Sequence, residues 1–293
     1  MGSGGNGERK EKTMTAISHL KIAANILFLY TTLMLGKTMA SEYSPKSFFT
    51  GSYLEAAKAI YSNDTNDLAK ALNQINDLDK PGINGESTLL IYAVKVGALK
   101  SIETLLEMGA SPEAKATDSN NNLFSAIYTS VTIKNTEPLN IFLKHGVSPN
   151  YIEENIPLIF SAQDWNNHDA INILVDNNLD VDIKSELGYS LLMDSLGRLD
   201  YDLAIFWLEK GVDVHHIDNL GRSATYSVQR GLERYIEGSE PHEKLQHIKK
   251  LMIDKGAEFP ALSPEEQREK LGIVWCEDPE GWMHRSECNV VGD

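Results

Sequence analysis

A short helix ending that occurs five times along the chain constrains the fold more than any other feature. Each copy has two apolar residues, a charged residue, one further residue and a stop. The stops are Gly109, Gly146, Asn178, Gly211 and Gly256. Glycine ends helices because it adopts the left-handed backbone conformation at no steric cost, and asparagine is the next best residue there. The single replacement therefore indicates a shared backbone geometry.

The spacing of these stops predicts a repeat. Successive stops lie 37, 32, 33 and 45 residues apart. Before the first stop, Leu99, Ile102, Leu105 and Leu106 recur at the spacing of one apolar helix face. Each unit therefore reads as a turn, a short helix, a second amphipathic helix and a tight stop. A period near 33 with a helix pair is that of ankyrin repeats, about one residue from the tetratricopeptide period.

The residues at the helix starts favour one of these families. The starts are Gly85-x-Ser87-x-Leu89, Ile156-Pro157-Leu158, Gly188-x-Ser190-x-Leu192 and a degraded Gly221-x-Ser223. They resemble the ankyrin pattern of glycine, any residue, threonine, proline, leucine and histidine, in degenerate form. Pro157 alone keeps the proline, and no copy keeps the histidine. The sequence thus resembles the ankyrin-repeat family, and a generic helical solenoid is the alternative.

This resemblance implies an all-α fold, an ankyrin-repeat solenoid of about six helix-turn-helix units with short β-turn fingers. The array is expected over residues 41–260, after an N-terminal segment of residues 1–40 and before a C-terminal cap or tail of residues 261–293. The units are expected near residues 47–80, 81–112, 119–149, 153–181, 186–214 and 219–259.

Three segments depart from the regular pattern. The first unit is expected to be an atypical cap, with Asp64 or Thr65 at the start of its second helix. An extra stretch near residues 129–137 would explain the 37-residue step. The polar insertion at residues 231–241 carries Gly238 and Pro241, which predicts a loop between two helices. Ser263 and Pro264 predict the start of a capped helix after the array.

The N-terminal segment has the order of a secretory signal. Lys21 precedes an apolar run over residues 22–36, and Thr38-Met39-Ala40 ends in a small residue. The run is short for a membrane span of about 20 residues. We expect cleavage near Ala40 and export to the bacterial periplasm or the cell exterior; an uncleaved inner-membrane anchor and a buried helix are the alternatives. A cytoplasmic form starting at Met39 stays open, and so does the origin of residues 1–13, which we exclude from the fold.

Cys276 and Cys288 are the two cysteines of the sequence. In an exported chain they most simply form one disulfide. Free thiols are the alternative, because neither a short Cys-x-x-Cys spacing nor further metal ligands accompany them.

The sequence offers no motif for catalysis, for a cofactor or for a metal. His242 and His247 lie five residues apart, whereas two zinc ligands on one helix face need a spacing of four. No nucleophile elbow or phosphate-binding glycine loop occurs. Asp180 with Asp182, and Asp213 with Asp218, read as turn formers. We therefore expect that the protein is not an enzyme.

The net charge of −15 excludes some partners. Nucleic acids and anionic membrane surfaces select basic proteins, so membrane contact is expected only through an uncleaved signal. The family resemblance implies a monomer when free that binds a protein through its fingers, near residues 115–121, 149–154, 182–189 and 214–222. An aromatic residue amid acids could anchor a basic partner, although a solvated acidic edge is the alternative. The expected contacts are Asp118, Tyr151, Glu153, Glu154, Glu186, Tyr189 and Asp218.

Two functional hypotheses follow from these expectations. In the first, the protein is exported and neutralises a toxic enzyme, since it resembles the ankyrin-type immunity proteins that act against type VI secretion effectors such as phospholipases. In the second, it is a periplasmic accessory protein that supports a resident enzyme such as a catalase. A secreted effector that binds host proteins is a third possibility.

Overall fold

The computed structural model describes residues 43–272. The chain divides into two compact units, with the division between Gly109 and Ala110, and each is described here by itself. The predicted export signal, the predicted cysteine pair and the tail beyond residue 272 lie outside the described residues.

Over residues 43–109, the first unit contains two helix pairs preceded by a short helix. Its elements are α2 (Pro45–Phe48), α3 (Gly51–Ser62), α4 (Thr65–Leu72), the 3-10 turn η1 (Ile83–Gly85), α5 (Leu89–Val96) and α6 (Leu99–Glu107). The side chain of Asp64 accepts hydrogen bonds from the backbone N–H groups of Asn66 and Asp67 and so caps α4. Of the two residues expected at this cap, Asp64 is the one that forms it.

Aromatic packing holds the start of the first unit. The rings of Phe49 and Tyr92 are both buried and meet edge to face, with centroids 5.5 Å apart. The Tyr92 hydroxyl donates a hydrogen bond of 2.7 Å to the Tyr43 carbonyl, so its polar atom is satisfied although its ring is buried.

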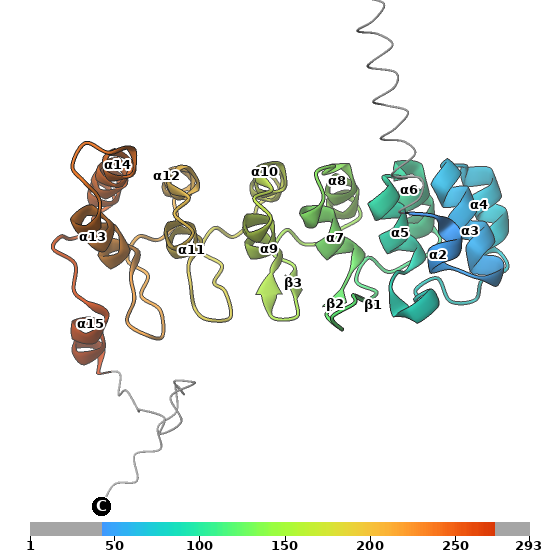
Figure 1. Ribbon diagram of the computed structural model, residues 1–293, viewed down its shortest axis with the longest axis horizontal. Helices are drawn as coiled ribbons and strands as arrows, with labels where there is room; N and C mark the ends of the chain where they lie inside the picture. The colour runs from blue at the N-terminus through green and yellow to red at the C-terminus, as the bar shows by residue number, and fades with distance from the viewer. Residues whose placement is uncertain (1–42, 273–293) are drawn as a thin grey trace, which may run out of the picture. The chain divides into compact units, whose positions relative to one another are not determined.

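The second unit contains four helix pairs and a final helix. The pairs are α7 (Ala126–Thr132) with α8 (Glu137–Lys144), α9 (Leu158–Asp164) with α10 (His168–Asp176), α11 (Leu191–Gly197) with α12 (Tyr201–Lys210), and α13 (Ala224–Arg234) with α14 (Glu240–Asp254). The final helix is α15 (Pro264–Leu271). Within this unit the first helices of the pairs form one row and the second helices another (Figure 1).

A finger precedes the first helix of each pair in the second unit, and these fingers project on the side away from the second helices (Figure 1). The first contains β1 (Ala116–Thr117) and β2 (Leu123–Phe124), which pair antiparallel. The next contains β3 (Ile152–Glu153) and β4 (Ile156–Pro157), also antiparallel. Single antiparallel bridges, Lys184 to Ser190 and Ile217 to Ser223, close the other two.

The predicted stops share one backbone geometry. The φ angles are 94° at Gly109, 92° at Gly146, 93° at Gly211 and 92° at Gly256, and Asn178 follows with 67°. This confirms the left-handed ending that the repeated residues predict.

Two details of the sequence analysis are wrong. Helix α13 continues to Arg234, so the predicted loop over residues 231–241 shrinks to the few residues before α14. The 37-residue step does not come from residues 129–137 either. Helix α7 begins 17 positions after Gly109, whereas α11 and α13 begin 13 positions after their stops. The extra residues therefore lie in the finger that contains β1 and β2.

The end of the array matches its prediction. Ser263 caps α15, Pro264 occupies its first turn, and Glu266 completes a capping box. No helix within residues 43–272 is both long enough and apolar enough to span a bilayer.

Candidate partner-binding surface on the fingers

The four fingers of the second unit carry every residue that the sequence analysis proposed as a partner contact. We number them by repeat: finger 3 is residues 115–124, finger 4 is 150–157, finger 5 is 182–190 and finger 6 is 214–223. Their positions agree with the predicted segments.

Hydrogen bonds tie neighbouring repeats together at the bases of the fingers. The Asn150 side-chain oxygen accepts from the backbone N–H of Asp180 at 2.8 Å. One repeat later, the Asp182 carboxylate accepts from the backbone N–H of Asp213, also at 2.8 Å. Nε2 of His216 lies 2.6 Å from the Gly188 carbonyl, to which it donates. Fingers 4, 5 and 6 are thus fixed relative to one another.

Three of the four aspartates expected to form turns do so, namely Asp180, Asp213 and Asp218, whereas the Asp182 carboxylate bonds the next repeat instead. Asp180 accepts from the N–H of Asp182 at 2.9 Å, and Asp213 accepts from the N–H of His215 at 2.8 Å. Both are side-chain to backbone bonds over two residues, the geometry of Asx turns.

Glu153 is buried, with 4% of its surface exposed. Its carboxylate accepts from the backbone N–H of Ser125 at 2.7 Å and from the Ser125 hydroxyl at 2.5 Å, and it pairs with Lys115 at 3.1 Å. Burial of a carboxylate is costly unless it is paired and hydrogen-bonded. All of these bonds are to finger 3 or to the start of α7, so Glu153 joins fingers 3 and 4.

Asp118 and Asp218 close the turns of fingers 3 and 6 in the same way. Asp118 accepts from the backbone N–H groups of Asn120 and Asn122, and the hydrogen bonds from Asn122 hold the pKa of Asp118 below its ordinary value. Asp218, 2% exposed, accepts from the corresponding N–H groups of Leu220 and Arg222. It also pairs with the Arg222 guanidinium at 2.6 Å.

The two tyrosines are half-buried, each beside residues of a neighbouring repeat. Burial, followed by the charges of Glu153 and Glu113 and a hydrogen bond with Glu153, raises the pKa of Tyr151 to about 12. The ring of Tyr189 lies under the Arg222 guanidinium, 4.4 Å from its centroid. Glu154 and Glu186 are the exposed members of the proposed contact set.

The most exposed apolar residues of the fingers are not among the predicted partner contacts. Leu123 is 48% exposed, Ile152 55%, Ile156 44% and Leu187 65%. We call these four residues the tip strip. A large aliphatic side chain inside a segment otherwise predicted as a polar turn was the available signal. Glu153 and Asp218 are occupied by bonds within the protein, and a contact with a partner stays a prediction for all seven residues.

Comparison with known proteins bears on the fold. The sequence matches no protein-family model and no curated protein sequence. The ankyrin-repeat domain of Bcl-3 is similar in structure, with a TM-score of 0.56 at 17% identity over 72% of this chain and 90% of that chain. The ankyrin-repeat domain of human ASB11 gives 0.51 at 16% identity over 72% and 87%. The ankyrin-repeat protein EF0377 gives 0.51 at 21% identity over 68% and 96%.

The chain has the ankyrin-repeat fold. The helix pairs and positive-φ stops described above are the repeats of this fold, and the tip strip lies on its fingers. At these identities the likeness concerns the fold alone. In the described part of this ankyrin chain, no three His, Cys, Asp or Glu residues cluster closely enough to hold a metal ion.

Proposed function

We propose that this ankyrin-repeat protein binds another protein through the tip strip, and that this binding neutralises a toxic enzyme in the periplasm. The observation that carries the proposal is the set of four exposed aliphatic residues on three successive fingers.

The fingers suit binding because they are held before a partner arrives. Hydrogen bonds and the buried Glu153 connect each finger with its neighbour. A surface that is already ordered loses less conformational freedom on association, which favours affinity. The exposed apolar side chains would then supply the buried contact area.

Charge favours a basic partner. The chain carries a net charge of −15, and the exposed carboxylates of Glu154 and Glu186 lie beside residues of the tip strip. Opposite charge accelerates encounter and suppresses wrong pairings. We therefore expect binding to weaken as salt is added, because exposed charges are screened within about 8 Å at physiological ionic strength.

The inhibitory role is supported by the sequence. The order of a basic lead, an apolar run and a small residue before residue 41 is that of an export signal, and no catalytic motif accompanies it. An exported acidic binding protein without chemistry of its own fits an immunity protein better than it fits an enzyme.

Co-expression with the product of the adjacent gene tests the proposal. If that product is a secreted toxin, cells that also export this protein should survive. Ile152→Asp combined with Leu187→Asp should abolish protection, because both charges would lie in the apolar contact. Ile253→Asp is the matched control, since Ile253 is 49% exposed on α14, away from the fingers.

Two results would contradict the proposal. Cells that die equally fast with and without this protein would remove the inhibitory role. Protection that survives the double substitution would move the contact away from the tip strip. A neighbouring catalase whose activity rises with this protein would instead support an accessory role.

A further inference from the structure

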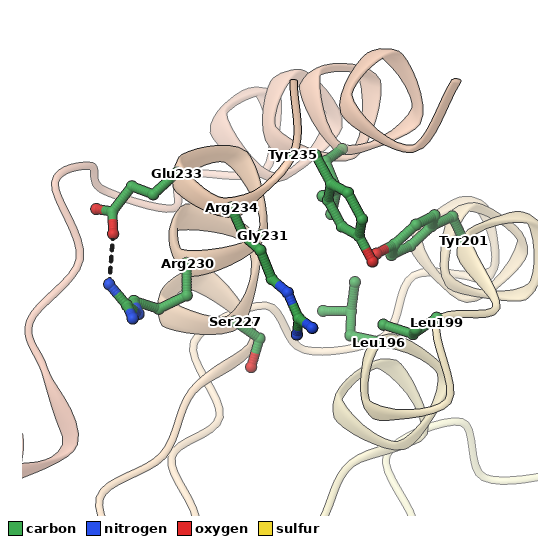
Figure 2. A pocket seen from close by; sticks show the side chains of 10 residues that line it. Leu196, Leu199, Tyr201, Ser227, Arg230, Gly231, Glu233, Arg234 and Tyr235 are labelled. Carbon is green, nitrogen blue, oxygen red and sulfur yellow. Dashed lines mark hydrogen bonds and ion pairs between the residues drawn. The ribbon is translucent and has the colours of Figure 1, made fainter. Parts of the chain in front are cut away.

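Within the second unit, the sixth repeat differs from the three before it in the length of its helices. Helix α13 has 11 residues, whereas α7, α9 and α11 have 7 each. The additional turn extends beyond the end of α11, and a cleft of about 440 Å³ lies between it and the turn that joins α11 to α12 (Figure 2). The departure from regular repeat length thus creates a concave site.

The floor of the cleft is apolar and closely packed. Leu196 of α11 and Leu245 of α14 are both buried there, and Leu199 lies at the rim with 57% of its surface exposed. Gly231 allows α13 to approach α14, because a Cβ atom at this position would lie 2.6 Å from a methyl group of Leu245. An apolar side chain could therefore enter the cleft and lose its contact with water.

A cation faces this floor. The Arg234 side chain reaches from α13 toward Leu196 and Leu199 (Figure 2). Arg230 points to the other side of the helix, where it pairs with Glu233 at 2.6 Å. Within residues 43–272, Arg234 has no carboxylate partner. The two arginines of one helix therefore differ: Arg230 is neutralised, and Arg234 is not.

Apart from the paired Arg230 and Glu233, the other polar side chains that line the cleft are hydroxyls. Ser227 lies on α13, about one helical turn before Arg230 and two before Arg234. At the opposite end of the cleft, the hydroxyl groups of Tyr201 and Tyr235 face each other (Figure 2). Burial, with a hydrogen bond to Tyr235, raises the pKa of Tyr201. Glu233 is the one carboxylate of the lining, and Arg230 holds it.

We infer that this cleft binds a segment of a partner protein that carries a carboxylate next to an apolar side chain. The carboxylate would meet the guanidinium of Arg234, whose planar donors match two carboxylate oxygens. The neighbouring apolar side chain would cover Leu196 and Leu199. The open rim, where Ser227 and Arg234 are exposed, leaves room for a chain that continues on both sides.

This site is distinct from the tip strip in position and in charge. The tip strip lies on the fingers beside exposed carboxylates, whereas the cleft lies at the helices and presents a cation. The inference needs a protein partner but not a toxic one, so it does not depend on the inhibitory role proposed above.

Peptide selection on the full-length protein tests the inference. Random short peptides displayed on phage are first selected for binding to the wild-type protein. Peptides that also bind the Arg234→Gln variant are then removed. We expect the remaining peptides to combine Asp or Glu with Leu, Ile, Phe or Trp. In fluorescence anisotropy these peptides should bind Arg234→Gln about tenfold more weakly, the loss expected for one charge-assisted hydrogen bond. Arg230→Gln, on the same helix but already paired, should change affinity by less than about twofold.

Three results would overturn the inference. The first is a selection in which no peptide distinguishes the wild type from Arg234→Gln. The second is an enrichment of basic or purely apolar peptides. The third is displacement of the selected peptides by a synthetic peptide of residues 273–293 that itself binds in an Arg234-dependent manner, because the occupant would then be this chain's own tail. Circular dichroism spectra of both variants confirm that the exposed substitutions leave the fold intact.

Discussion

Two adjacent glutamates on finger 4 have opposite surroundings. Glu153 is buried and holds Ser125 and Lys115, whereas the Glu154 side chain is 54% exposed and lies 3.6 Å from Lys115. Glu153 is the last residue of β3, whereas Glu154 begins the turn and has a positive φ of 46°, so the backbone turns the second side chain away from the first. One carboxylate therefore supports the finger and the other is exposed to solvent.

Replacement of these glutamates should separate the two roles. Glu153→Gln removes the charge that holds the Ser125 N–H and the Lys115 ammonium, and we expect a loss of about 1–3 kcal/mol in the free energy of unfolding. Glu154→Gln should change it by less than about 0.5 kcal/mol. Urea denaturation of both variants measures the difference, and equal effects would contradict the assignment.

The raised pKa of Tyr151 predicts an effect at alkaline pH. The phenol has an ordinary pKa of 10.0 and one of about 12 in the folded protein, so the folded state holds this proton more tightly than the unfolded state. The stability from this group is complete below pH 10 and is lost as the pH rises toward 12. Titration of the phenolate absorbance should show one fewer late-titrating tyrosine in Tyr151→Phe. An unchanged late phase would show that Tyr151 titrates normally.

The stops could be read from the sequence because their geometry is local. Glycine and asparagine adopt a positive φ at least cost whatever surrounds them, and one or the other occupies each of the five stops. Burial is not local. Glu153 is closed off by a serine 28 positions away, so nothing in its own segment distinguished it from an exposed acid.

At the scale of elements, α15 packs on finger 6 through a glycine. Gly221 has a φ of 78°, and a Cβ atom there would lie 2.4 Å from the Pro264 carbonyl oxygen. Arg268 of α15 donates to the Leu220 carbonyl at 2.8 Å. The final helix is therefore held by close backbone approach and by one arginine.

Two glycine substitutions test this packing. Gly211→Ala introduces backbone strain alone, since nothing lies within 4 Å of its Cβ position, and should cost about 1–2 kcal/mol. Gly221→Ala adds a clash with Pro264, so it should cost more and should release α15 from finger 6. Hydrogen exchange of the α15 amides measures the release. Equal protection of α15 in the two variants would contradict this packing.

The element lengths were harder to predict than the element types. The insertion at residues 231–241 contains glycine and proline, which favour a loop, yet α13 continues through Gly231 because that glycine packs against Leu245. Tertiary contact overrides local preference here. The extra residues of the third repeat were likewise predicted in the wrong place, near residues 129–137, whereas they lie in its finger.

At the scale of the molecule, the second unit is a series of repeats joined by neighbour contacts. A polar chain crosses from the fourth repeat to the fifth: the Trp207 indole N–H donates to the Gln163 side chain at 2.7 Å, and Gln163 donates to Asp194. Arg198 pairs with Asp194 of its own repeat and with Asp164 of the fourth. Gln163 and Trp207 are both buried, so the hydrogen bond between these two side chains is shielded from water.

Gln163→Ala should therefore weaken the junction between two repeats. It leaves the indole N–H of Trp207 buried without an acceptor, and we expect a loss of about 1–3 kcal/mol. Because repeats contact only their neighbours, the unfolding transition should also broaden. Gln246→Ala, an exposed glutamine on α14, is the control and should change neither quantity. A sharp two-state transition in Gln163→Ala would argue against a junction of this kind.

The repeat fold was predictable because the same helix ending occurs five times along the sequence. The period could therefore be read even where the residues of one copy depart from the family pattern. The binding surface has no such redundancy. Leu123, Ile152 and Leu187 occur once each in turns of different length, and their exposure becomes apparent only when the fingers are in place.

The hydrogen bonds at the finger bases determine how freely the residues at the finger tips can be replaced. Two of them join a side chain of one repeat to a backbone N–H of the next, as Asn150 does with Asp180 and Asp182 with Asp213. Backbone donors are indifferent to the side chains around them, so residues at the tips can be exchanged without disturbing the register. A library randomised at positions 123, 152, 156 and 187 should thus yield folded variants with new specificities, which makes the chain a candidate scaffold for engineered recognition.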